Sequence, residues 1–121
     1  MYRDPATATV ESTHVVQAFT DRATRRFGDW IQKVLFFGSQ ARGKAGAGSD
    51  YDLLVVVRRK DPDLVDQLYD EVLDCLFRDG VEVSLKIYTE ESFEDGLRLR
   101  NPFLCSVTET GVELWTAREK S

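Results

Sequence analysis

The chain has 121 residues, which is enough for one domain; we expect this domain to span 1–121, with its core over about 15–115 and a polar tail at 116–121. A composition that is 42% hydrophobic and 11% aromatic supplies a core and excludes general disorder. The 16 basic and 21 acidic residues give a net charge of −5, which disfavours direct nucleic-acid binding through phosphate neutralisation.

The first half of the chain predicts a helix, two strands and a loop between the strands. Apolar residues recur at four-residue spacing along one helix face: Val15, Phe19, Ala23 and Phe27. Gly28 is a plausible end for this helix, and residues 33–37 follow as a short buried strand. Residues 38–49 are rich in Gly, Ala and Ser, which predicts a loop with room for one helical turn. The apolar run 53–57 predicts a central strand covered on both faces.

The middle of the chain predicts a second helix and a third strand. Asp61 and Pro62 are typical of a helix N-terminus, and apolar residues continue at helical spacing up to Gly80. Residues 81–88 alternate between apolar and polar side chains, so we expect a strand with one buried face.

The C-terminal part predicts a short helix and an edge strand. Asn101 and Pro102 begin the helix, Gly111 ends it, and residues 112–115 form the strand. The predicted order is therefore helix, strand, loop, strand, helix, strand, helix, strand. This order indicates an α/β (α+β) fold with a small mixed sheet of about four strands and helices packed on it.

Two carboxylates stand at the start of the predicted central strand. Asp50 and Asp52 are two residues apart, so their side chains point into the same volume. Two neighbouring carboxylates repel each other and are best tolerated around a cation. Their hard oxygen ligands suit Mg²⁺ or Mn²⁺, which proteins often bind together with substrate phosphates.

The loop before this carboxylate pair has features of a phosphate site. Gly38 lets a phosphate approach the backbone closely, and Ser39 can donate hydrogen bonds to it. Arg42 and Lys44 add positive charge to an acidic protein, although a purely solvated role for Lys44 is equally consistent with the sequence. Together with the carboxylates, these residues indicate metal-assisted chemistry on a nucleoside triphosphate.

The segment 35–57 resembles the nucleotidyltransferase superfamily related to DNA polymerase β, and within it the minimal nucleotidyltransferases. The pattern of that group is an apolar strand, Gly-Ser, about ten residues, and Asp-x-Asp leading into an apolar strand. The matching residues here are Gly38, Ser39, Ala41, Arg42, Gly43, Ser49, Asp50 and Asp52. Ten residues separate Ser39 from Asp50, as in the family pattern. The resemblance covers about residues 33–115 and implies the polymerase β-like nucleotidyltransferase fold.

The family also has a third carboxylate on a neighbouring strand. Glu82 is our candidate, because it lies on the polar face of the strand predicted at 81–88. Ser84 is the next residue on that face and is the alternative occupant of the third position. With Ser84 there, the third ligand would be missing.

The resemblance implies nucleotidyl transfer with two Mg²⁺ ions and ATP as the nucleotide donor. The residues implied as metal ligands are Asp50, Asp52 and Glu82, and those implied for the β and γ phosphates are Gly38, Ser39 and Arg42. The acceptor hydroxyl would lose its proton to a carboxylate, with Glu82 the candidate, and attack the α-phosphorus as pyrophosphate leaves.

The resemblance also implies a prokaryotic antitoxin whose partner is a HEPN-type toxin protein. In that family the antitoxin can transfer AMP from ATP onto a tyrosine of the toxin. A first alternative is a catalytically silent antitoxin that acts by binding alone. A second alternative is an enzyme that modifies a small hydroxyl compound such as an antibiotic.

Three further kinds of site match these residues less well. Residues 38–45 lack the Ser or Thr that completes a P-loop, and further glycines follow instead of a long helix. Ser39 lacks the second glycine of a hydrolase nucleophile elbow. Phosphatases with an Asp-x-Asp nucleophile have the strand before the pair, whereas here it follows.

His14 is interpreted as a solvated helix residue.

The sequence also bears on the compartment of the protein. It contains no apolar run near the roughly 20 residues of a membrane span, and its first residues do not resemble a secretion signal. Cys75 and Cys105 are too few for a disulfide framework, so we expect them to be reduced and structural. We therefore expect a cytoplasmic protein.

Overall fold

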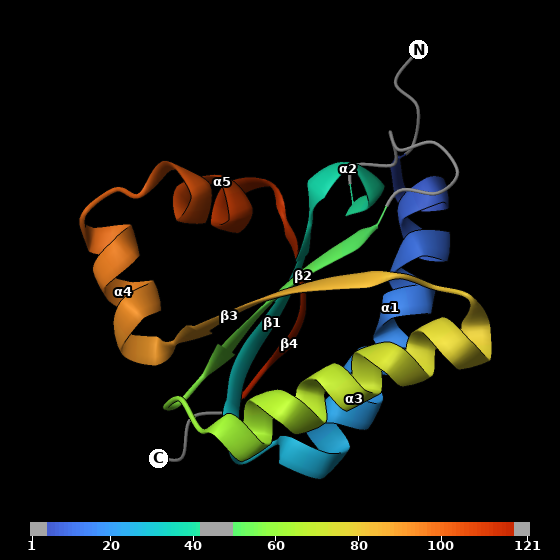
Figure 1. The fold of residues 1–121 in the computed structure, drawn as a ribbon. Coiled ribbons are helices and arrows are strands. Elements are labelled where there is room, and N and C mark those ends of the chain that lie inside the picture. The colour runs from blue at the N-terminus through green and yellow to red at the C-terminus, as the bar shows by residue number, and fades with distance from the viewer. Residues whose placement is uncertain (1–4, 42–49, 118–121) are drawn as a thin grey trace.

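The computed structural model describes residues 5–41 and 50–117, with the element order α1-β1-α2-β2-α3-β3-α4-α5-β4 (Figure 1). The helices are α1 (Pro5–Phe27), α2 (Gly38–Ala41), α3 (Pro62–Asp79), α4 (Glu90–Arg98) and α5 (Pro102–Thr110). The strands are β1 (Ile31–Phe37), β2 (Tyr51–Val57), β3 (Val83–Thr89) and β4 (Val112–Thr116).

The four strands form one mixed sheet in the order β3-β2-β1-β4. β1 runs antiparallel to both β2 and β4, whereas β2 and β3 are parallel. Parallel neighbours need a long crossover connection, which α3 supplies between β2 and β3. The predicted mixed sheet of about four strands is confirmed, with β2 inside it and β4 at one edge.

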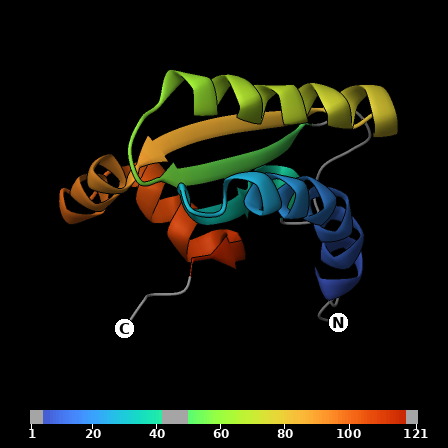
Figure 2. The ribbon, with the colours of Figure 1, turned by 90° about the horizontal axis from the view of Figure 1, so that it is seen from below.

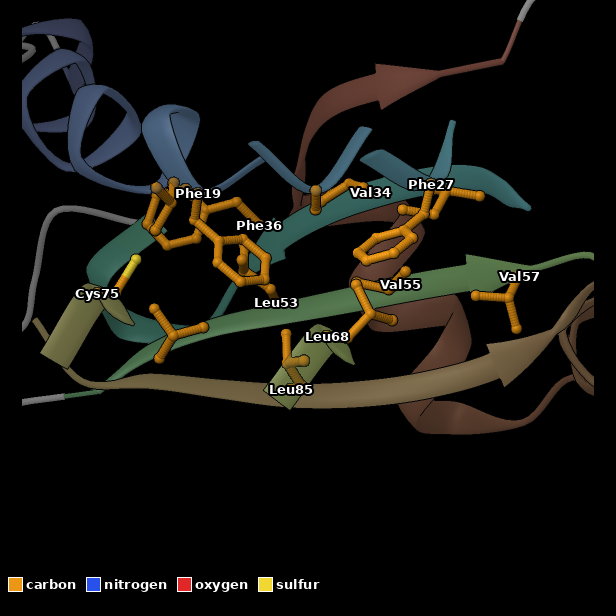
Figure 3. Packing of buried hydrophobic residues seen from close by; sticks show 14 of the residues in the cluster. Phe19, Phe27, Val34, Phe36, Leu53, Val55, Val57, Leu68, Cys75 and Leu85 are labelled. Carbon is orange, nitrogen blue, oxygen red and sulfur yellow. The ribbon is translucent and has the colours of Figure 1, made fainter. Parts of the chain in front are cut away.

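One face of the sheet is covered by α1 and α3. Figure 3 shows Leu53, Val55 and Val57 of β2 pointing to the side where Phe19 of α1 and Leu68 of α3 lie. All five of these side chains are almost fully buried. Apolar residues on the inner faces of both helices thus pack on the same side of the central strand.

The opposite face of the sheet is covered by α4 and α5. Leu54 and Val56 of β2 pack there with Phe93 of α4 and with Leu104 and Val107 of α5. Figures 1 and 2 both show α4 and α5 together, away from α1 and α3. The prediction that the run 53–57 is covered on both faces is confirmed, because all its residues are buried.

The predicted helix ends are confirmed by their capping geometry. The side chain of Asp61 accepts hydrogen bonds from the backbone N–H groups of Asp63 and Leu64 at the start of α3. Gly80 ends α3 in the left-handed conformation, with φ of 66°. The side chain of Asn101 accepts from the backbone N–H of Leu104 at the start of α5.

The structure differs from the prediction at two helices. The predicted element order did not include α4, whose only buried side chain is Phe93 and which contains a glycine, so its apolar pattern is weak. The local signal that it does have is Thr89, whose hydroxyl accepts from the backbone N–H of Ser92. α1 begins at Pro5, well before the apolar spacing that starts at Val15.

Two further predictions concern the loop and the membrane. The helical turn allowed in the predicted loop is α2, while residues 42–49, which include Arg42 and Lys44, lie outside the described residues.

Within the described ranges, none of the helices combines the length and apolar character that crossing a membrane requires.

Candidate functional site

Asp52 lies near the start of β2, on the sheet face that α4 and α5 cover further along. It pairs with Phe37 of β1 and with Ser84 of β3 in the strand register. Because side chains alternate along a strand, it shares its face with Leu54 and Val56, which are buried under α4 and α5. Asp52 itself is half-buried. It therefore stands where the helical cover of this face ends.

Asp50 precedes β2 and is exposed, and its charge acts on Asp52. Burial raises the pKa of the Asp52 carboxyl above its ordinary value, and the negative charge of Asp50 raises it further. The positive charge of Lys86 on β3 acts in the opposite direction and lowers it. The structure therefore brings the two predicted carboxylates together, in a place where their negative charge is not fully compensated.

Gly38 joins β1 to α2 directly beside Asp52. Its φ of +86° is a left-handed conformation that favours glycine. A Cβ atom added at Gly38 would collide with the Oδ2 atom of Asp52. The backbone thus approaches the carboxylate so closely that any side chain at position 38 would have to displace it. Ser39 follows as the second residue of α2.

The candidates for the third carboxylate occupy successive positions on one side of β3. Ser84 is the direct neighbour of Asp52 in the parallel register. Glu82 is exposed and lies just before the strand, where its backbone carbonyl accepts a hydrogen bond of 2.9 Å from the N–H of Tyr51. Asp50 and Glu82 each directly precede a member of the Tyr51–Val83 pair, at the entry to β2 and β3 respectively.

The Asp pair fits a divalent cation by its chemistry. Two close carboxylates, one of them with a raised pKa, gain from a cation between them, and oxygen ligands suit Mg²⁺. In the part of the chain that the structure describes, no three His, Cys, Asp or Glu side chains are grouped so that they could share one metal ion. Glu82 is therefore not gathered with Asp50 and Asp52 into a three-ligand site here.

Lys86 is a residue of this site that the sequence analysis did not single out. It is exposed and lies on the same face of β3 as Ser84, and its charge acts on Asp52. The sequence does indicate its position, because Lys86 alternates with apolar residues and so lies on the same polar side of the strand as Glu82 and Ser84.

The remaining chemically active residues lie elsewhere. Cys75 is buried and Cys105 half-buried, and both are free thiols, which agrees with the predicted absence of a disulfide. Burial raises the pKa of the Cys75 thiol. His14 is exposed on α1, as expected for a solvated helix residue.

Comparisons with known proteins agree with the resemblance noted in the sequence. A family model described as "Nucleotidyltransferase domain" matches residues 17–109. The "Putative protein adenylyltransferase MJ1305" of Methanocaldococcus jannaschii is 31% identical over 104 residues, which cover 84% of this chain and 69% of that protein.

Solved structures share the fold. One is a toxin–antitoxin crystal structure with AMP-PNP, at a TM-score of 0.57 and 20% identity, covering 84% of this chain and 74% of that one. Another is a nucleotidyltransferase, so named with the qualifier "putative", from Sulfolobus solfataricus, at a TM-score of 0.52 and 18% identity, covering 96% and 90%. At these identities the similarity establishes the fold, and the predicted fold class is confirmed.

Proposed function

We propose that this chain, which belongs to the nucleotidyltransferase domain family, transfers AMP from ATP to an acceptor hydroxyl group. The observation that carries the proposal is the Asp50–Asp52 pair, with the backbone of Gly38 lying against Asp52. Such a pair can hold the Mg²⁺ that accompanies a nucleoside triphosphate, and an open glycine backbone lets the phosphates approach closely.

The acceptor that we propose is a tyrosine hydroxyl of a HEPN-type toxin, with this chain as the antitoxin. The relative from Methanocaldococcus jannaschii is named as a protein adenylyltransferase, with the qualifier "putative", which supports a protein acceptor. A toxin–antitoxin crystal structure with AMP-PNP has the same fold, which supports both the pairing and the nucleotide.

In this proposal Asp50 and Asp52 hold Mg²⁺, and Glu82 joins them as the third carboxylate only when the cation and the nucleotide are bound, since the described side chains by themselves form no three-ligand group. Bound Mg²⁺ would neutralise the charge of the triphosphate and of the developing transition state. Gly38, Ser39 and Arg42 bind the β and γ phosphates.

The proposed reaction is an in-line displacement at the α-phosphorus. The acceptor oxygen attacks as its proton passes to the carboxylate of Glu82, which the structure leaves exposed at the start of β3. The bond between the α-phosphorus and the bridging oxygen to the β-phosphate breaks, and pyrophosphate leaves. The acceptor ends as an AMP ester.

The experiment that tests the proposal follows the label of ATP onto a protein acceptor. The chain is incubated with Mg²⁺, a HEPN-type toxin protein and ATP labelled at either the α or the γ phosphate. We expect the α label to appear on a toxin tyrosine and the γ label to stay off it. Asp52→Asn should abolish transfer, whereas Asp29→Asn, an exposed aspartate before β1, should leave it unchanged.

A second candidate function is a catalytically silent antitoxin. The observation that favours it is Ser84, which stands beside Asp52 in the register where a carboxylate would complete the site. In that case the chain would bind the toxin and neutralise it, no label would be transferred, and Asp52→Asn would neutralise the toxin equally well.

A further inference from the structure

Helix α3 exposes a row of large apolar side chains on the side that faces away from the sheet. The row consists of Tyr69, Leu73, Leu76 and Phe77, whose exposed fractions are 45%, 48%, 40% and 81%. Their spacing of four, three and one residues places them on one helix face. A helix that is apolar on both its inner and its outer side is typically buried on both.

No described part of the chain covers this row. In Figure 2, α3 forms the upper boundary of the molecule, with the sheet on its inner side. The inner side of α3 already packs on the sheet through Leu64, Leu68 and Cys75. The outer row is therefore available to something outside the described residues, and exposed apolar patches of this kind mark interaction sites.

An acidic border runs along this row. Asp66, Asp70 and Asp74 follow each other at four-residue spacing and are all exposed. Among the described side chains, none forms a salt bridge with them. The only basic residue of α3, Arg78, is four residues after Asp74 and so lies on the same helix face, at the C-terminal end of the border. The border therefore carries three negative charges against one nearby positive charge, and its net charge is negative.

We propose that this acidic, apolar face of α3 docks a helix of a partner protein whose apolar face is bordered by Lys and Arg. Such a helix satisfies both features, because it buries the apolar row and pairs with the three aspartates. The inference concerns a surface separate from Asp52 and does not depend on nucleotidyl transfer.

The charge pattern argues against two other occupants. In an antiparallel two-fold pair of α3 helices, the acidic borders of both copies would fall on the same side and repel each other. Each copy also has a net charge of −5, which adds to this repulsion. A membrane surface is disfavoured because its anionic lipids attract basic segments.

The experiment uses the full chain and two labelled helical peptides with the same apolar face of leucines. One peptide has lysines beside the leucines and the other has glutamates. We expect saturable binding of the lysine peptide in fluorescence anisotropy, and binding of the glutamate peptide that is at least about tenfold weaker.

Two double variants test the two features of the surface separately. Leu73→Gln with Phe77→Gln removes apolar contact and should weaken binding of the lysine peptide by about tenfold or more. Asp70→Asn with Asp74→Asn should weaken it and flatten its dependence on salt. Glu91→Gln with Glu94→Gln on α4 removes the same charge elsewhere and should leave binding unchanged. All these positions are exposed, so thermal unfolding should stay close to that of the wild type.

Three outcomes would overturn the proposal. Equal binding of the two peptides would remove the role of the acidic border. Binding that is unaffected by the α3 variants would place the contact on another surface. Sedimentation showing a dimer that Leu73→Gln with Phe77→Gln dissociates would identify a second copy of this chain as the occupant.

Discussion

The backbone of Gly38 lies against the carboxylate of Asp52 so closely that a single methyl group added to Gly38 would collide with an Asp52 oxygen. The contact links the end of β1 to the start of β2, which are neighbours in the sheet. It also accounts for the glycine at the point where the chain turns from a buried strand into α2. The strand register fixes the two residues relative to each other, so changes at either should affect both.

ATP with Mg²⁺ should raise the Tm of the wild-type protein if the site binds them, and Gly38→Ala should abolish this shift. The added methyl group displaces the Asp52 carboxylate, and the left-handed backbone costs a further ~1–2 kcal/mol in unfolding free energy. Gly80→Ala is the matched control, because Gly80 also has a positive φ but nothing lies within 4 Å of an added Cβ. It should lose about 1 kcal/mol yet keep the ligand-induced shift in Tm. An equal ligand shift in both variants would contradict the prediction.

Asp52→Asn should stabilise the ligand-free protein at neutral pH. Because the pKa of Asp52 is raised in the folded state, its charged form is penalised there, and stability is lost as the pH rises through that pKa. The variant lacks the penalty. Its advantage in urea unfolding should therefore vanish as the pH falls below the ordinary value of 3.8, where both proteins are uncharged at this site. An advantage that is independent of pH would show that the raised pKa is not its cause.

Lys86→Gln should raise the pKa of Asp52 further. The positive charge of Lys86 favours the ionised carboxylate, so its removal leaves burial and the charge of Asp50 unopposed. Titration of the Asp52 carboxyl by NMR measures this directly. Lys60→Gln is the control, since Lys60 is an exposed cation beyond the opposite end of β2. The prediction fails if both variants move the titration equally.

Glu82→Gln and Ser84→Ala distinguish the two candidates for the third position. If Glu82 accepts the proton of the acceptor hydroxyl, its replacement should reduce AMP transfer by about a hundredfold or more. Ser84→Ala should then change transfer only slightly. Rates of label transfer under saturating ATP measure both. Transfer by Glu82→Gln at the wild-type rate would contradict this role and leave Glu82 as an ordinary exposed residue.

Glu71→Gln should destabilise the fold by about 3 kcal/mol. The Glu71 side chain is buried on α3 and pairs with Arg22, at 3.1 Å, and with Arg26 of α1. Its replacement leaves both guanidinium groups without their carboxylate. Glu113→Gln is the control, because Glu113 is exposed in its 3.4 Å pair with the half-buried Lys33, and the pair should contribute less than about 1 kcal/mol. Urea unfolding at neutral pH compares the two, and a similar loss in both would contradict the expected difference.

The helix ends that were predicted correctly rest on interactions between near neighbours in the chain. The ends of α3 follow from the hydrogen bonds of Asp61 and the left-handed Gly80, which are local events. The helix α4 was missed because a short segment with few apolar residues is stabilised mainly by packing of Phe93 against a sheet that the sequence does not display.

The sequence by itself determined the fold class, because the order of helices and strands follows from local apolar patterns. It also determined the pairing of Asp50 with Asp52, because residues two apart at a strand point to the same side. Only the tertiary structure decided which residues of other strands stand beside them. The parallel register of β2 and β3 places Ser84 next to Asp52, and a shift of one residue would have changed that neighbour. Lys86 and the contact of Gly38 with Asp52 likewise depend on the register, since strands distant in sequence are aligned by the packing of the whole sheet.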